Sequence, residues 1–218
     1  MILVKFENEN IRLQAVSLWQ EAFGDSTEYI NFFLDTHESC TCLTHEENGK
    51  LCSALFLIEG SLCGKSAYYL FAAATFKSQR GKGCMAKLLE KAENYAKQNG
   101  RAYIVLVPAE NSLFDYYSRF GYNTCFYAKR QGINEEFEID KTKCFVWNKA
   151  HEEYIKAESE NFGTQIFEKS GMLFSVYGNN EIKVPVKKAD EKYRYGMALS
   201  LDDNISQENL YIGLTLDG

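Results

Sequence analysis

Proline is scarce in this chain of 218 residues, since only Pro108 and Pro185 occur, and no low-complexity linker is present. Composition therefore reveals no hinge between domains. No apolar run approaches the roughly 18–20 residues that a membrane-spanning helix needs. The first residues carry neither a basic leader nor a small-residue cleavage site, so we expect no signal peptide. With 45% hydrophobic residues, the chain can build one sizeable core, alone or with a small appended lobe.

The cysteines follow neither a disulfide nor a zinc-finger pattern. There are seven, an odd number, no CxxC occurs, and most lie in apolar, strand-like runs. We therefore expect buried thiols in a reducing cytoplasm. Cys40, Cys42 and His45 suggest a metal site. In a strand, however, Cys40 and Cys42 would share one face while His45 would point to the other. Two thiolates without a third ligand make a poor zinc site, so we expect no metal.

Basic runs are also missing. The formal net charge is −6, and no run of Lys and Arg exceeds two residues. An acidic surface repels phosphate backbones, so we expect no nucleic-acid partner and no membrane partner. The charge balance favours a cationic substrate such as an amine, although ordinary solubility accounts for the same balance.

Hydrophobic periodicity predicts alternating strands and helices over the first 130 residues. Strands are expected near residues 1–6, 40–45, 51–59, 68–76, 102–107 and 122–128. Helices are expected at residues 10–23, from Met85 to Gly100 and from Ser112 to Gly121. A further helix is expected to begin after a cap at Asp25 or Ser26. The later part is predicted as strands near 136–140, 144–147, 163–167, 172–176, 182–186, 195–199 and 210–216, with a helix near 149–160.

A glycine-bearing turn follows the apolar run at 68–76 and opens the next helix. The first N–H groups of a helix have no intrahelical partner and carry partial positive charge. Gly81 and Gly83 allow close approach of the backbone to a ligand, and Arg80 and Lys82 add full charge. These features predict an anion site suited to a pyrophosphate. A tight turn with solvated basic residues is the structural alternative. The segment lacks both the Walker spacing and the GxGxxG pattern, since Ala86 replaces the last glycine.

The segment Arg80-Gly81-Lys82-Gly83-Cys84-Met85 resembles motif A of the GNAT (GCN5-related) acetyltransferases, which runs Arg/Gln-x-x-Gly-x-Gly/Ala. Met85 replaces the small residue of the last position, where the motif chiefly supplies a backbone N–H. Residues 108–122 resemble motif B, which ends Tyr-x-x-x-Gly-Phe/Tyr, with Tyr117 on the tyrosine and Gly121 on the glycine. The resemblance covers about residues 1–130.

The resemblance implies a mixed α/β fold of the GNAT type. Its central twisted sheet is mixed, mostly antiparallel, splayed between the fourth and fifth strands and flanked by helices. We expect residues 1–130 to form the acetyltransferase domain. Residues 131–218 would form an α+β extension that packs on the sheet or the acceptor cleft. This extension weakly resembles the degenerate second half of two-lobed GNAT proteins.

The resemblance also implies an acetyl-CoA-dependent N-acetyltransferase that acts on a primary amine of a small molecule or peptide by direct attack on the thioester. Tyr117 would protonate the departing thiolate, and an N–H near Thr75 would polarise the thioester carbonyl. Tyr116 is expected to pack inward. The implied coenzyme-binding residues are Ala73, Ala74, Thr75, Arg80, Gly81, Lys82, Gly83, Cys84, Met85, Asn111 and Tyr117.

Two alternatives stay open at this point. If its acceptor site were not functional, the chain would be a non-catalytic acyl-CoA-binding sensor or interaction module. The same loop would also suit another phosphate ligand, such as a nucleotide. The sequence names neither the acceptor amine nor a general base, and it leaves open the acyl-chain preference and a homodimer.

Overall fold

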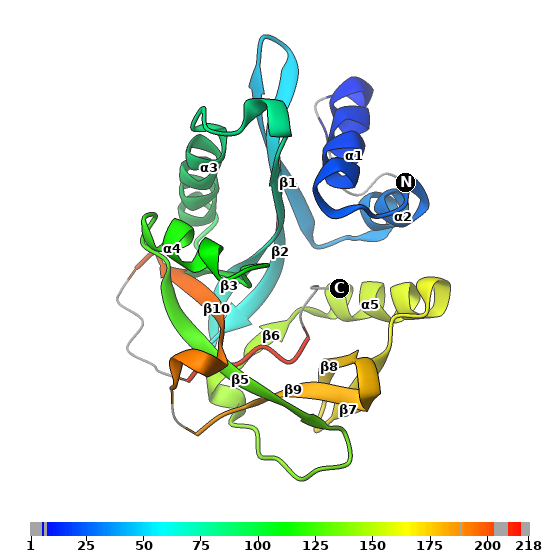
Figure 1. The fold of residues 1–218 in the computed structure, drawn as a ribbon, viewed down its shortest axis with the longest axis vertical. Coiled ribbons are helices and arrows are strands. Elements are labelled where there is room, and N and C mark those ends of the chain that lie inside the picture. The colour runs from blue at the N-terminus through cyan, green and yellow to red at the C-terminus, as the bar shows by residue number, and fades with distance from the viewer. Residues whose placement is uncertain (1–5, 7, 188, 203–208, 215–218) are drawn as a thin grey trace.

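The computed structural model describes residue 6 and residues 8–187, 189–202 and 209–214. A ten-stranded mixed sheet is flanked by α-helices, which confirms the predicted fold class (Figure 1). The helices are α1 (Glu9–Phe23), α2 (Thr27–Thr36), α3 (Cys84–Gln98), α4 (Ser112–Ser118) and α5 (Lys149–Phe162). The strands are β1 (Cys40–Glu47), β2 (Lys50–Leu62), β3 (Lys65–Thr75), β4 (Tyr103–Leu106), β5 (Asn123–Gly132), β6 (Phe145–Trp147), β7 (Ile166–Lys169), β8 (Met172–Tyr177), β9 (Glu181–Pro185) and β10 (Arg194–Ser200). No helix in these residues is long and apolar enough to cross a membrane.

Local capping decides where the first two helices begin and end. Gly24 ends α1 in the left-handed conformation, with φ of 80°, which glycine adopts without steric cost. Ser26 caps α2, because its Oγ accepts a hydrogen bond from the Tyr29 N–H. Asp25, the alternative cap, instead accepts a hydrogen bond from Trp19 Nε1 at 2.7 Å.

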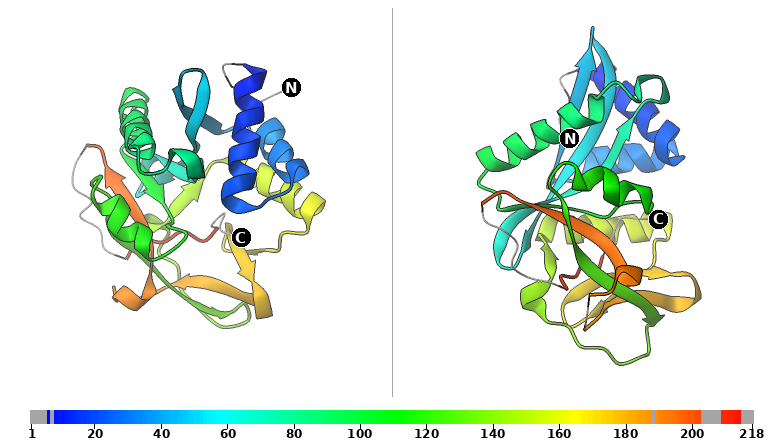
Figure 2. Two further views of the ribbon diagram at one scale, coloured as in Figure 1. Left: turned by 45° about the horizontal axis from the view of Figure 1, so that its top comes forward. Right: turned by 60° about the vertical axis from the view of Figure 1, so that its left-hand side comes forward.

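The sheet order is β1-β2-β3-β4-β10-β5-β9-β8-β7, and β6 pairs with the far end of β2. The β3–β4 pair is parallel, while the other strand pairs named here are antiparallel. β10 comes from late in the chain but lies between β4 and β5, and pairs with both. β5 continues past β10 and pairs with β9, so the sheet extends into the lower part of the molecule (Figure 2). Residue 130, the predicted domain boundary, therefore falls inside β5, and the division into two domains stays a prediction.

Alternate residues of the central strands point to two separate cores. In β2, Leu55 and Leu57 pack with α3 and α4, whereas Phe56 and Ile58 pack with α1 and α2. A strand buried on both faces lies between two helical layers, as its almost continuous apolar sequence predicts. Figure 2 shows α3 on one side of these strands and α1 and α2 on the other.

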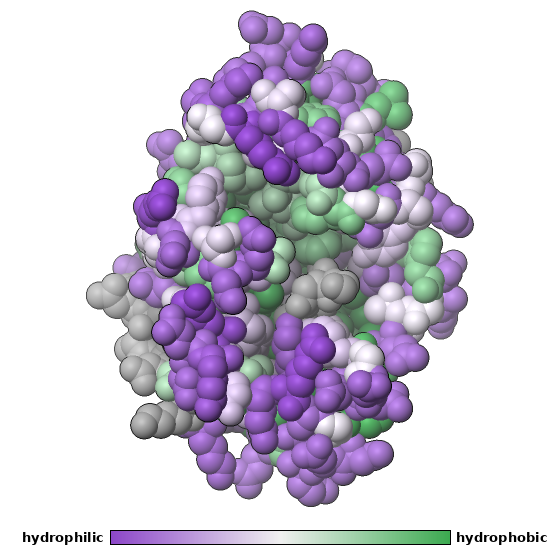
Figure 3. Space-filling model, in the orientation of Figure 1, coloured by the Kyte–Doolittle hydropathy of each residue, from purple (hydrophilic) through white to green (hydrophobic). Residues whose placement is uncertain are grey.

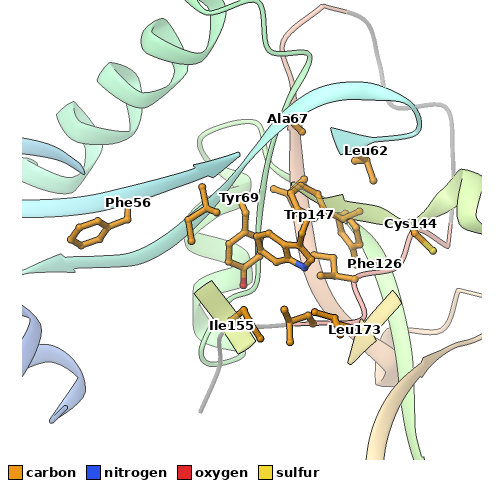
Figure 4. Packing of buried hydrophobic residues seen from close by; sticks show 14 of the residues in the cluster. Phe56, Leu62, Ala67, Tyr69, Phe126, Cys144, Trp147, Ile155 and Leu173 are labelled. Carbon is orange, nitrogen blue, oxygen red and sulfur yellow. The ribbon is translucent and has the colours of Figure 1, made fainter. Parts of the chain in front are cut away.

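The later part of the chain packs on the core of the first part. Trp147 of β6 meets Tyr69 of β3 with ring centroids 5.0 Å apart (Figure 4). The α5 ring of Tyr154 lies 5.7 Å from that of Phe32 in α2. Gly60 of β2 makes this docking possible, because Phe145 occupies the space that any side chain there would need. One aromatic core therefore spans both parts of the chain.

Three sequence expectations differ from the structure or lie beyond it. Residues 136–140 form no strand, and their predicted alternation reflects apolar side chains on a loop, where Phe137 and Ile139 pack against the core. Of the strand predicted at 210–216, the described residues form only isolated bridges at Leu210 and Tyr211. The strand predicted at residues 1–6 lies almost wholly outside the described residues.

Candidate active site

The sheet opens between β3 and β4. The two strands pair at only three positions, from Ala67 opposite Tyr103 to Tyr69 opposite Val105. β3 then runs on to Thr75, while β4 ends at Leu106. On its other side β3 stays paired with β2 as far as Thr75. The β4-facing edge of residues 70–75 is therefore not paired with β4, so main-chain groups along it can bind a ligand or water.

A bulge interrupts β3 within this open stretch. Phe56 and Ala54, two residues apart in β2, stand opposite Phe71 and Ala74, which are three residues apart. The extra residue in β3 accompanies a left-handed backbone at Ala72, with φ of 47°. Bulges re-aim the neighbouring main-chain groups, and non-glycine residues with positive φ cluster at functional sites. Nothing in a run of three alanines signals this bulge, so sequence analysis did not identify Ala72.

The predicted anion loop lies directly beyond the open edge. Gly83 is the N-cap of α3, and Lys87 makes the first intrahelical hydrogen bond, from its N–H to the Gly83 carbonyl at 3.1 Å. The N–H groups of residues 84–86 thus have no partner within the helix. Gly81 and Gly83 have φ of 76° and 79°, and no atom lies within 4 Å of a Cβ built on either. The loop is open to a ligand on the side where side chains would stand.

The loop has two exposed basic side chains and two less polar side chains that pack inward. Arg80 and Lys82 are exposed; Arg80 Nε donates to the Thr75 carbonyl at 3.3 Å, and Lys82 Nζ to Gln79 Oε1 at 2.9 Å. The Cys84 side chain is buried. Met85 packs against the core between the sheet and the helices α3 and α4, called here the α3-side core. Both side chains therefore pack inward at the start of α3.

Tyr117 lies on α4 with its side chain turned into the α3-side core. Tyr116 also packs against this core, as expected, although it is only half-buried whereas Tyr117 is buried. Burial, and then the neighbouring Tyr116, raise the pKa of Tyr117 to about 12. Within the described part of the chain, no residue hydrogen-bonds the Tyr117 hydroxyl. It is thus held in its protonated form with its hydrogen available to a ligand.

The remaining predicted residues lie at the ends of the same elements. Ala73 and Ala74 follow the bulge, and the Thr75 hydroxyl is buried without a hydrogen-bond partner. Asn111 precedes α4, is exposed, and makes no capping hydrogen bond with its side chain. Figure 3 shows an apolar recess between α3 and α4 on one side and α1 on the other. The fold thus gathers the open strand edge and the loop at one end of β3.

Comparison with known proteins identifies the family. A family model described as an acetyltransferase (GNAT) domain matches residues 7–125, more than half of the chain. No protein of curated function matches the chain. A probable N-acyltransferase from Enterococcus faecalis V583 has a similar structure, with a TM-score of 0.63 at 10% identity over 93% of this chain and 73% of that one. An aminoglycoside 6'-N-acetyltransferase complexed with coenzyme A gives a TM-score of 0.52 at 11% identity, over 94% of this chain and 99% of that one.

At these low identities the two structures support only the fold, whereas the family model assigns the chain to a family. The chain belongs to the GNAT acetyltransferase family and is an acyl-CoA-dependent N-acetyltransferase.

Proposed function

We propose that the protein transfers the acetyl group of acetyl-CoA to a primary amine of a small molecule or peptide, which attacks the thioester directly. The observation that carries this proposal is the unpaired edge of β3 running straight into the glycine loop of α3. A ligand that binds both must be extended at one end and anionic at the other. Coenzyme A has this form, since its amide-containing pantetheine arm ends in a pyrophosphate.

The coenzyme would be held mainly by main-chain groups. The edge at Ala73, Ala74 and Thr75 would pair with the amides of pantetheine as another strand would. The N–H groups of residues 84–86 and the positive end of the α3 dipole would bind the pyrophosphate. Arg80 and Lys82 are exposed beside them, so their hydrogen bonds to Thr75 and Gln79 can be exchanged for phosphate oxygens. Asn111 at the start of α4 would contact the pantetheine or the incoming amine.

The transition state needs stabilisation at two atoms. The thioester oxygen gains negative charge as the amine attacks, and an N–H near Thr75, turned by the bulge at Ala72, would donate to it. The sulfur gains charge as the carbon–sulfur bond breaks, and the Tyr117 hydroxyl would donate to it. With its pKa raised to about 12, Tyr117 is a weaker acid than a thiol of pKa about 8.5. It therefore acts as a hydrogen-bond donor to the leaving sulfur. The proton that the nucleophilic nitrogen loses after attack then protonates the thiolate and gives the free thiol of coenzyme A.

The acceptor must present a neutral nitrogen. An alkyl ammonium has a pKa of about 10.4, so a base or a chain of waters must remove one proton before attack. The formal net charge of −6 favours the approach of a cationic amine. These considerations support an amine as the acceptor class without selecting one compound.

Release of free coenzyme A thiol tests the proposal. We expect acetyl-CoA to yield thiol in the presence of a suitable member of a panel of polyamines, aminoglycosides and peptides with free N-termini. An equal amount of acetylated amine should form. Tight acetyl-CoA binding with no acetylated product from any amine would instead support the non-catalytic sensor. A melting temperature raised by ATP but not by acetyl-CoA would favour a nucleotide on the loop.

A further inference from the structure

Three side chains of different chemistry converge beside the glycine loop. One ring nitrogen of His45, one carboxylate oxygen of Glu47 and the sulfur of Cys84 all lie within 4.8 Å of one another. His45 and Glu47 belong to β1, whereas Cys84 is the first residue of α3. The His45 Nε2 and Glu47 Oε1 atoms are 3.4 Å apart. The side chains of this cluster have no role in the acetyl transfer proposed above, in which Cys84 would contribute only its main-chain N–H.

The faces of β1 explain this convergence. Leu43 packs into the α3-side core, while Cys40 and Cys42 pack on the opposite side of the strand. His45 comes two residues after Leu43 and therefore shares the face that α3 covers. Lys91 of α3 donates to the Thr44 carbonyl at 3.1 Å and keeps the helix against the strand. The sequence analysis considered and rejected a metal site of Cys40, Cys42 and His45. The structure places the two cysteines on one face of β1 and His45 on the other, where His45 lies beside Cys84.

We propose that His45, Glu47 and Cys84 form a Zn²⁺ site. Thiolate, imidazole and carboxylate are the three ligand types that Zn²⁺ takes in proteins. Bonds of about 2.0–2.3 Å to four tetrahedral ligands place the ligand atoms about 3.3–3.8 Å from one another, a spacing that small side-chain rotations of the cluster reach. One thiolate and one carboxylate also balance the double charge of the ion, and the thiol proton is released to solvent on binding.

Water would complete the site as the fourth ligand, as it does in zinc sites with three protein ligands. Two present contacts must give way: Lys87 Nζ lies 3.5 Å from Glu47 Oε1, and the Cys84 thiol faces the Gln79 carbonyl at 3.7 Å. Lys87 is an exposed side chain and can turn into solvent without loss of packing.

The site would act on the coenzyme loop through the backbone. Cys84 directly follows Gly83, the N-cap of α3, and its N–H is one of the unpaired donors of the loop. Zinc would fasten this residue to the β1–β2 hairpin, because His45 and Glu47 lie in the last residues of β1 before the hairpin turn. Zinc at this site would be contrary to the sequence expectation of no metal, and its binding would not depend on the acceptor or on catalysis.

Zinc titration of the full-length, chelator-treated protein tests the site. We expect calorimetry to show one Zn²⁺ per chain and the melting temperature to rise with zinc. His45→Gln, a change at a partly exposed position, should weaken zinc binding at least 10-fold. Cys42→Ser, a thiol lost from the opposite face of β1, should leave the affinity unchanged. No zinc binding, or the same affinity in His45→Gln, would overturn the proposal.

Cobalt gives a second readout that reports the ligands directly. Bound Co²⁺ should show a thiolate-to-metal charge-transfer absorption in the wild-type protein and in Cys42→Ser. The band should vanish in Cys84→Ser, whose folding is checked by circular dichroism. If Cys84→Ser does not fold, His45→Gln carries the test through its loss of cobalt affinity. A charge-transfer band that persists in a folded Cys84→Ser would assign the metal to other thiols and exclude this site.

Discussion

The imidazoles of His37 and His151 meet in the interior, with Nε2 of His37 2.8 Å from Nδ1 of His151, and neither residue is exposed to solvent. His37 follows α2 and His151 lies in α5, so the pair joins distant parts of the chain. One ring donates its N–H and the other accepts, so the accepting ring must be neutral, and burial disfavours a charge on either ring. Burial lowers the pKa of His37 to about 3 and holds that of His151 well below its usual value.

This pair should make the protein sensitive to acid. In the unfolded chain each histidine takes up a proton near pH 6.5, whereas the folded protein takes up neither until much lower pH. The contribution of the pair is therefore complete above about pH 6.5 and is lost as the pH falls towards 3. The free energy of unfolding should decrease by up to about 1.4 kcal/mol per pH unit for each proton. Urea unfolding at several pH values between 5 and 7 measures this slope.

The double variant His37→Phe/His151→Phe is the control for the slope. It should flatten the pH dependence between 5 and 7, whatever its stability at neutral pH. Glu158, which accepts a hydrogen bond from Tyr29 in the same helical interface, has a raised pKa through burial and acts in the opposite direction. An unchanged slope in the double variant would assign the acid sensitivity to other groups.

Tyr117→Phe should lower the turnover number about 10²–10³-fold, as expected for loss of a hydrogen-bond donor to the charge that develops on the leaving sulfur. Acetyl-CoA affinity should change little, because the buried ring is kept and only the hydroxyl is removed. Steady-state kinetics with calorimetric binding separates the two effects. Tyr116→Phe, on the half-buried neighbour, should retain turnover within a few-fold. Wild-type turnover in Tyr117→Phe would exclude the donor role.

Gly83→Asp should weaken acetyl-CoA binding by placing a carboxylate where we propose the pyrophosphate binds. The matched control is Gly83→Asn, which has the same shape without the charge and bears the same strain of a positive φ at this position. The ratio of the two dissociation constants from calorimetry isolates the electrostatic repulsion, and we expect Asp to bind at least 10-fold more weakly. Equal affinities in the two variants would contradict the placement of the phosphates.

Gly60→Ala should destabilise the protein by about 1–3 kcal/mol, as overpacking of a core does. A Cβ at this position would lie 2.6 Å from Phe145 Cε1 and 2.9 Å from the Val146 carbonyl oxygen, and Phe145 is only 1% exposed. Gly178→Ala is the control, because no atom lies within 4 Å of its Cβ. Denaturant unfolding of both variants measures the difference. Equal stability would show that β6 docks on β2 less tightly than the structure indicates.

Local signals predicted much of the fold and of the coenzyme loop. The glycines of the loop and the helix pattern after them placed α3 and its unpaired N–H groups, since these features depend only on neighbouring residues. The β1–β2 hairpin agrees with the strands predicted at 40–45 and 51–59, and Asn48 and Gly49 between them both adopt positive φ. The sequence did not predict that α4 buries Tyr117 more deeply than Tyr116, because that difference depends on how α4 rotates against the sheet.

The sequence by itself determined the alternation of strands and helices, the family and the loop at Arg80–Met85, because periodicity and glycine conformations act over a few residues. Only the tertiary structure decided that β10 lies between β4 and β5, that β3 bulges at Ala72, and that His45 meets Cys84. Strand pairing and side-chain convergence join residues far apart in the chain. The register of the paired strands depends on how whole layers pack, and a local sequence pattern does not determine it.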